Sequence, residues 1–443
     1  MSSNSASATS PAPGVPETSE SAEPPESTEE PYPHQHTTQY WEKWRGVFTG
    51  IVRRGLEGMV LLVAIQYFHA GEFHKAWLAA AVSVGQLLSP LSVYLAARLG
   101  LPVARALALL FAASGVALLI SALFENLHLY FAGVMLSVPL ISMSATLVTE
   151  LWRQNVPDLK RGFLFSSVSE RGSLGGLAAT VLMAVWIGGQ LERYRAVFAV
   201  IALCLFGAAY CFARIPSRAL ERPRRHPWAG LAWLWKDRTF GYVCATWMLM
   251  GIANLAILPL RMEYVANEDK SVGLGYDAWI VLLLIQIVPG LVRFISAHFW
   301  GRMFDNANFI VLRIVLNLLF AFNMLLFFQD QFWVQILAAV CFGLGEGGGE
   351  IAWSLWVTKF SPPNRTAEYM GVHVFLTGLR GVIAPQIVYS LLAPLGMRTI
   401  TYVTMGMILV ASAMLLPLLS MGRRMAAEQN ALRSASENPV PGP

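Results

Sequence analysis

The chain has 443 residues, of which 55% are hydrophobic and 13% are charged, and its mean hydropathy is +0.51. This balance excludes a soluble globular domain of this size and indicates an integral membrane protein. The formal net charge of +5 is explained by basic loops beside a membrane, so it gives no reason to expect a nucleic-acid partner.

Apolar blocks of about twenty residues recur along the chain, which is the length an α-helix needs to cross the hydrocarbon core of a bilayer. We expect spans at residues 51–71, 76–97, 103–123, 127–151, 163–189, 196–214, 240–262, 277–299, 308–328, 333–356, 367–393 and 399–421. The sequence therefore predicts an all-α membrane protein of about twelve transmembrane helices.

The distribution of basic residues predicts the orientation of these spans. With the N-terminus in the cytoplasm, about 23 of the 32 Lys and Arg residues fall on the cytoplasmic side and about 6 fall outside. We therefore expect both termini to be cytoplasmic, in a protein of the inner or plasma membrane.

Polar segments divide the chain into domains. Residues 1–40 are rich in Ser, Pro and Glu, which is typical of a disordered tail. A basic linker at 215–239 separates an N-terminal six-helix half, 41–214, from a C-terminal six-helix half, 240–421, and residues 422–443 form a second tail.

The two halves carry matching signals. Span four ends in "LWRQNVPDLKRG" and span ten ends in "LWVTKFSPPNRT", and an Arg-Gly pair recurs in the helix that follows each of them. The loop after span two reads "VYLAARLGLPVAR", and the loop after span eight reads "GRMFDNANFIVLR". These correspondences indicate an internal repeat.

The two loops resemble the Gly-x-Leu-Ala-Asp-Arg-x-Gly-type motif of the major facilitator superfamily. The second copy keeps Gly301 and Asp305, whereas the first keeps Arg98 and Gly100 but lacks the acid. The resemblance implies two pseudo-symmetric halves, a central cavity lined by the first and fourth helices of each half, and a gating latch at these loops. The missing acid leaves that latch in doubt for the N-terminal half.

The stretch "CFGLGEGGGEIAWSLW" places two acids and five glycines in span ten. Glu346 and Glu350 share a helix face at i, i+4, so we expect them to be candidates for proton coupling. The alternative is a structural ion pair with Arg380 or Arg293. The glycines indicate either close helix packing or a hinge.

Glu57 is a third candidate for proton coupling, provided that its helix begins earlier than the apolar block. The alternative is a local ion pair with Arg53 or Arg54 at the membrane surface. Arg293 lies near the end of span eight, where we expect its side chain to extend toward the headgroups.

Polar and aromatic residues inside the spans are candidates for solute binding. Buried guanidiniums hold anions, amides donate and accept hydrogen bonds, and an indole stacks on flat solutes. The alternatives are helix-tying ion pairs, interhelical amide contacts and interfacial tryptophans. The candidates are Arg171, Arg380, Asn254, Gln66, His373 and Trp353.

The sequence carries no HExxH, GxSxG or P-loop motif and no ligand-spaced Cys or His set, so we expect no enzyme activity, cofactor or metal. The expected function is secondary active transport of a small polar or anionic solute, coupled to protons, by a monomer that works by alternating access. The alternatives are an efflux antiporter for drugs or other amphipathic solutes and a sensor or scaffold that no longer transports.

Overall fold

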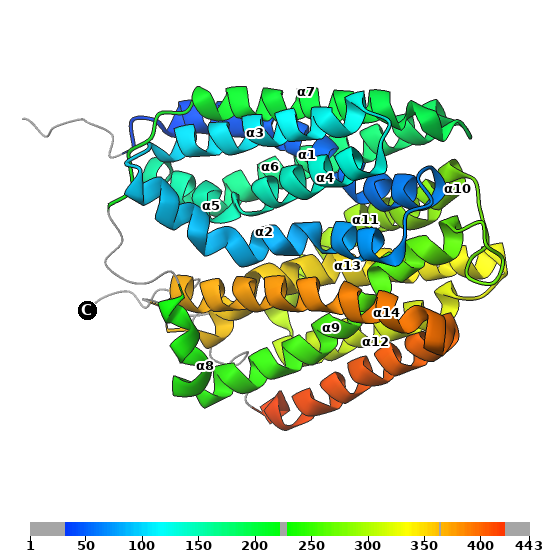
Figure 1. Ribbon diagram of the computed structural model, residues 1–443. Coiled ribbons are helices and arrows are strands. Elements are labelled where there is room, and N and C mark those ends of the chain that lie inside the picture. Colours follow the sequence, from blue (N-terminus) through cyan, green and yellow to red (C-terminus); the bar gives the residue numbers. More distant parts are fainter. Residues whose placement is uncertain (1–31, 222–227, 363–364, 421–443) are drawn as a thin grey trace, which may run out of the picture.

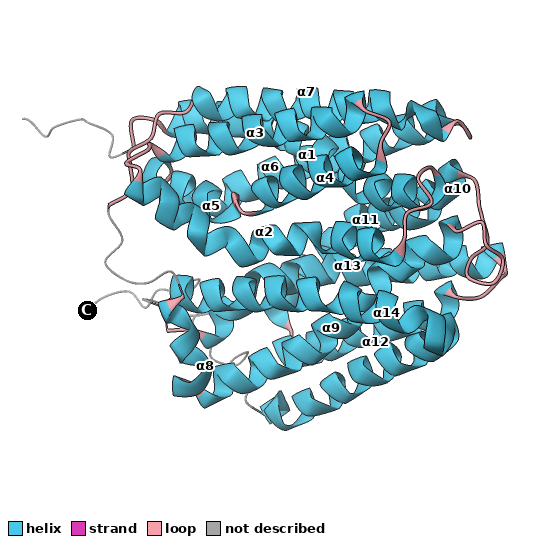
Figure 2. Cartoon of the chain, in the orientation of Figure 1, coloured by secondary structure: helices cyan, strands magenta, loops and turns pink. Residues whose placement is uncertain are grey.

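The computed structural model describes residues 32–221, 228–362 and 365–420, and within these ranges it is helical with no β-strand (Figure 2). The helices before residue 222 are α1 Gln35–Gln66, α2 Glu72–Arg98, α3 Val103–Leu123, α4 Leu127–Ser142, α5 Ala145–Asn155, α6 Asp158–Ile187, the short η1 Leu191–Arg193 and α7 Tyr194–Ala213. The later helices are η2 Ala229–Ala232, α8 Trp233–Lys236, α9 Arg238–Ala266, α10 Ala278–Leu282, the π-helical η3 Leu283–Ile287, α11 Val288–Asn306, α12 Phe309–Phe327, α13 Phe332–Phe360, α14 Thr366–Leu415 and η4 Leu416–Leu418.

Nine helical segments in the described ranges are long and apolar enough to cross a membrane. They include the expected spans from α2 to α4, and the continuous α14 counts once. Helix α1 is not among the nine, because Arg53, Arg54 and Glu57 interrupt its apolar run. The all-helical, membrane-protein fold predicted from composition is therefore confirmed at this level.

Several helices differ from the apolar blocks in their bounds. Helix α1 begins at Gln35, well before the predicted block at 51–71, and it places Glu57 deep in the helix. The block at 127–151 is interrupted between α4 and α5, after Pro139. Helix α14 breaks at Gly396, whose φ of 73° is left-handed and suits glycine. This break separates the two blocks predicted at 367–393 and 399–421.

The helices form two groups that run along a common direction (Figure 1). One group contains α1, α3, α6 and α7. The other contains α9, α12, α13 and α14. The two groups meet mainly where α2 packs along α14. Gly378 of α14 allows this approach, because a Cβ there would lie 2.6 Å from the backbone nitrogen of Leu87. Both ends of the described chain lie at the same end of the bundle (Figure 1).

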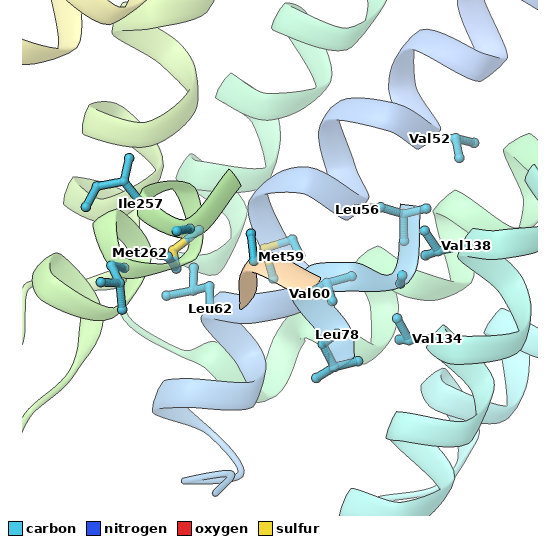
Figure 3. Packing of buried hydrophobic residues seen from close by; sticks show 14 of the residues in the cluster. Val52, Leu56, Met59, Val60, Leu62, Leu78, Val134, Val138, Ile257 and Met262 are labelled. Atoms are coloured by element: carbon cyan, nitrogen blue, oxygen red, sulfur yellow. The ribbon is translucent and has the colours of Figure 1, made fainter. Parts of the chain in front are cut away.

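The buried core continues from one group into the other. Met59 and Leu62 of α1 are fully buried, and they lie beside Ile257 and Met262 of α9 in Figure 3. On the outer surface many large apolar side chains, such as Trp333, remain exposed, as expected for helices that face lipid. The core therefore holds α1, which carries Arg53, Arg54 and Glu57, against the other half of the molecule.

Candidate functional site: a six-charge cluster between α1, α11 and α13

Six charged side chains from three helices meet within the bundle. We call this group the six-charge cluster; it consists of Arg53, Arg54 and Glu57 of α1, Arg293 of α11, and Glu346 and Glu350 of α13. The three arginines and three glutamates carry no net charge if all are ionised. Such a group inside a membrane protein is expensive and is therefore a candidate functional site.

Helical spacing produces the pairs within α1. Arg53 Nε lies 2.9 Å from Glu57 Oε1 at i, i+4, and Arg54 Nη1 lies 3.1 Å from Glu57 Oε2 at i, i+3. The local ion pair expected from the sequence is therefore present. Because α1 begins at Gln35, however, the pair lies deep in the helix and faces the other half of the molecule.

The glutamates of α13 form ion pairs with arginines of the N-terminal half. Glu350 pairs with Arg53 at 3.4 Å and with Arg293 at 3.2 Å. Glu346 lies 3.7 Å from Arg293 and 4.0 Å from Arg54. Each glutamate thus faces one arginine of α1 and the arginine of α11.

The cluster has a buried side and a more exposed side. The side chains of Arg54 and Arg293 are only 8% and 10% exposed, whereas those of Arg53 and Glu350 are 53% and 40% exposed. The buried arginines need the carboxylates as partners, because an unpaired charge there is strongly destabilising. Arg53 and Glu350 are therefore the more accessible members of the cluster.

A π-helical turn adds an amide to the cluster. Gln286 lies in η3 and accepts a hydrogen bond of 3.1 Å from Arg54 Nη1, while Arg54 Nη2 has no hydrogen-bond partner. Single π-helical turns within α-helices are frequent at functional sites. The turn thus completes a polar site between α1 and α11.

The glycines of α13 allow close packing in a continuous helix. A Cβ on Gly343 would lie 2.6 Å from the carbonyl oxygen of Pro289 in α11, whereas a Cβ on Gly345 or Gly349 would face the ring of Phe320 in α12 at 3.2 Å and 3.5 Å. The helix runs unbroken through the glycines from Phe332 to Phe360. The close packing expected for this stretch is therefore observed, in a helix without a break.

Three of the expected solute-binding residues lie in a second group, and none of them takes part in the ion pairs of the six-charge cluster. Arg380 donates to the carbonyl oxygen of Trp247 and to Thr377 Oγ1, and His373 packs against the rings of Trp247 and Trp353. Trp353 also donates to Thr377 Oγ1 at 3.4 Å. Arg293, and not Arg380, is therefore the guanidinium that faces Glu346 and Glu350.

The other three candidates are separate from both groups. Arg171 is exposed on α6 and donates to Ser167 one turn earlier. Asn254 donates to Met250 Sδ at 3.3 Å. Gln66 donates to the carbonyl oxygens of Ala266 and Tyr276, at 2.9 Å and 2.8 Å, and thus joins α1 to the other half.

The residues of the expected gating motif lie in two places. Arg98 and Gly100 are at or just after the end of α2, and Gly301 and Asp305 are near the end of α11. Arg98 is the exposed last residue of α2, and Gly100 has a φ of 65°, which suits glycine at this turn. Gly301 lies in α11 with open space around it. The side chain of Asp305 lies outside the described part of the structure, so the latch stays a prediction.

The sequence did not place Arg53, Arg54 and Gln286 beside the two glutamates. It left two alternatives for Arg293, of which the ion pair with Glu346 and Glu350 is the one observed. The other alternative, in which the side chain extends toward the headgroups, is wrong, because this side chain is buried against Glu346 and Glu350. The amphipathic continuation of α1 upstream of residue 51 is the signal that places Arg53 and Arg54 within the bundle.

The comparisons agree with this fold. The sequence profile of the Major Facilitator Superfamily matches residues 46–385. A mutant of the nucleoside transporter NupG superposes with a TM-score of 0.70 at 11% identity, covering 86% of this chain and 99% of that one. The D-xylose-proton symporter gives a TM-score of 0.64 at 15% identity and 86% and 97% coverage. A POT family transporter in complex with 5-aminolevulinic acid gives 0.67 at 14% identity and 89% and 97% coverage. The comparison with curated protein sequences gives no match.

Proposed function

Because this chain belongs to the major facilitator superfamily, we propose that it is a secondary transporter in which the six-charge cluster couples proton movement to solute movement. The observation that carries this proposal is the pairing of α1 with α13, through Arg53 and Glu350 and through Arg54 and Glu346. The cluster connects the two halves that must move relative to each other in alternating access.

We also propose the topology that the sequence indicates: two six-helix halves with about twelve spans, and both termini in the cytoplasm. The common position of both described chain ends in Figure 1 supports termini on one side of the membrane. The excess of Lys and Arg in the loops at that end supports the cytoplasmic side. The transporter is placed in the plasma or inner membrane, and a monomer contains both halves of the site.

Protonation of a glutamate changes the charge balance of the cluster. Glu350 is its most exposed carboxylate, and a proton there removes the negative charge that pairs with Arg53 and Arg293. The cluster then carries one positive charge, and Arg293 is buried without full compensation. A solute carboxylate, or the hydroxyl groups of a polar solute, can then pair with these arginines. Proton and solute therefore bind together, which is the requirement for coupled transport.

The similar solved structures favour a small polar solute as a second possibility beside an anion. Their printed names include a nucleoside transporter and a D-xylose-proton symporter. In this chain Gln286 next to Arg54 offers an amide for sugar or base hydroxyl and carbonyl groups. We propose the class of small polar or anionic solutes on these grounds.

The test uses protein reconstituted in liposomes that contain a pH-sensitive dye. Uridine, D-xylose, succinate and dialanine are added singly, and lumenal acidification is followed with and without an imposed pH gradient. We expect one of these classes to move protons with it, and we expect Glu350→Gln and Glu346→Gln to abolish the uphill accumulation of that solute. Glu150→Gln is the matched control, because Glu150 also pairs with an arginine, Arg153, but lies outside the cluster.

Three outcomes count against the proposal. Unchanged uphill accumulation in the variant that combines Glu346→Gln with Glu350→Gln removes the cluster from coupling. Saturable binding of a solute without any flux favours the sensor or scaffold, and proton efflux driven by amphipathic cations favours the drug antiporter.

A further inference from the structure

A second group of buried polar side chains lies in the C-terminal half and contains two arginines without an acidic partner among the described residues. We call it the arginine–tryptophan cluster; it consists of Trp247 of α9, Arg313 of α12, and His373 and Arg380 of α14. Arg313, His373 and Arg380 are each more than nine-tenths buried. No ion pair of either arginine with a carboxylate occurs among the described residues.

The two guanidiniums approach the same indole ring. Arg313 Cζ lies 4.3 Å from the centroid of Trp247, and Arg380 Cζ lies 6.0 Å from it. Gly251 of α9 leaves room for Arg380, because a Cβ there would overlap the guanidinium. Two like charges are thus held near one ring in a part of the protein that excludes water.

The hydrogen bonds of these groups are incomplete. Arg380 donates from its Nη atoms to the carbonyl oxygen of Trp247 and to Thr377 Oγ1, but its buried Nε has no partner. Arg313 contacts the thioether sulfur of Met250, which is a weak acceptor. His373 Nε2 is buried without a partner as well. The cluster therefore has free hydrogen-bonding capacity beside uncompensated positive charge.

The arginines of the six-charge cluster differ from this pair. Arg53, Arg54 and Arg293 each have a carboxylate within 4.0 Å. Contacts with an aromatic ring, a carbonyl and a sulfur do not neutralise a charge as a carboxylate does. Among the described residues, no carboxylate balances the charges of Arg313 and Arg380.

We propose that a small anion binds in the arginine–tryptophan cluster, between α9, α12 and α14, where it accepts from Arg380 Nε–H and balances the charges of Arg380 and Arg313. Its chemistry is that of a halide or a single carboxylate group, because the donors come from buried side chains around one ring. The halide comes from the medium, whereas a carboxylate belongs to an organic acid. This site is separate from the six-charge cluster and does not depend on proton coupling.

The first test uses the purified wild-type protein in a gluconate buffer. Chloride, bromide or acetate replaces gluconate at constant ionic strength while the melting temperature is recorded. Equilibrium dialysis with radiolabelled chloride, and separately with radiolabelled acetate, measures the stoichiometry. We expect a saturable rise in melting temperature and close to one bound anion per chain. Preference for chloride identifies an inorganic ion, and preference for acetate identifies a carboxylate.

Variants locate the site. We expect Arg380→Gln and Arg313→Gln to weaken anion binding by about tenfold or more, equivalent to about 1.4 kcal/mol. Arg380→Lys keeps the positive charge, and we expect it to retain measurable anion binding. This variant is used to test the site if the glutamine variants do not fold. Arg261→Gln is the matched control, because Arg261 is a buried arginine that lies against Phe327 and Phe342 outside the cluster.

Two results overturn the proposal. One is the absence of saturable chloride or acetate binding to the wild-type protein, which needs no variant. The other is unchanged anion binding in the Arg380→Gln and Arg313→Gln variants, which places the anion elsewhere.

Discussion

Lys75 of α2 and Glu263 of α9 form a buried ion pair between the two halves of the molecule, with Nζ 2.6 Å from Oε1. Glu263 also accepts from Asn267 at 2.6 Å and from Tyr389 at 3.4 Å. The pair lies where α2 begins and α9 ends, at the end of the bundle away from the described chain ends (Figure 1). We interpret it as a latch that holds this end closed.

Removal of one partner of this latch is expected to destabilise the protein. Glu263→Gln leaves the Lys75 ammonium buried without an anion, and we expect a loss of about 3–5 kcal/mol in the free energy of unfolding. Lys75→Met leaves the carboxylate alone and has an effect in the same direction. The measurement is thermal unfolding of the purified variants in detergent, with Arg153→Gln as an exposed ion-pair control.

A double variant separates the pair from its surroundings. Lys75→Met combined with Glu263→Met removes both charges, and we expect it to recover most of the loss seen in the single variants. Additive losses in the double variant contradict a direct interaction between the two side chains.

Much of the fold follows from the sequence, because lipid requires long apolar helices and hydropathy detects them. The blocks from 76–97 to 103–123 closely match α2 and α3. The bounds fail where polar residues share a helix with apolar ones. Helix α1 extends back to Gln35 through a stretch that mixes polar and apolar residues, which a search for apolar blocks does not detect.

The site was predicted only in part. Glu346 and Glu350 were visible because acids in an apolar block are unusual. Their partners Arg53 and Arg54 lie about three hundred residues earlier, and no local pattern reports a contact over that separation. The pair of Lys75 and Glu263 was missed for the same physical reason, because each residue alone resembles an ordinary charge near a helix end.

The glycines of α13 differ in how closely they meet their neighbours, and substitutions should reflect this. A Cβ on Gly343 would overlap the backbone of Pro289, whereas a Cβ on Gly349 would meet Phe320 at an ordinary distance of 3.5 Å. We expect Gly343→Ala to cost about 1–3 kcal/mol through overpacking and Gly349→Ala to cost little. Thermal unfolding of the two variants gives the comparison, and equal melting temperatures contradict the packing seen between α11 and α13.

The orientation in the membrane can be checked with reporters. We expect a fluorescent protein fused after residue 443 to fluoresce, as it does in the cytoplasm, and a periplasmic phosphatase fused there to be inactive. Fusion in the loop after α9, near Asp269, is expected to give the opposite result. Phosphatase activity of the C-terminal fusion contradicts the proposed topology.

The last prediction concerns the two sides of the six-charge cluster. Arg53 is largely exposed, so its ion pairs are expected to add no more than about 1 kcal/mol to stability. Arg293 is buried, and its loss leaves Glu346 and Glu350 without their shared partner. We therefore expect Arg53→Gln to melt like the wild type and Arg293→Gln to lose about 3–5 kcal/mol. Both variants are expected to lose proton-driven accumulation, because both arginines hold Glu350. Wild-type transport by Arg53→Gln, measured in liposomes beside its melting curve, contradicts a coupling role for the pair that joins α1 to α13.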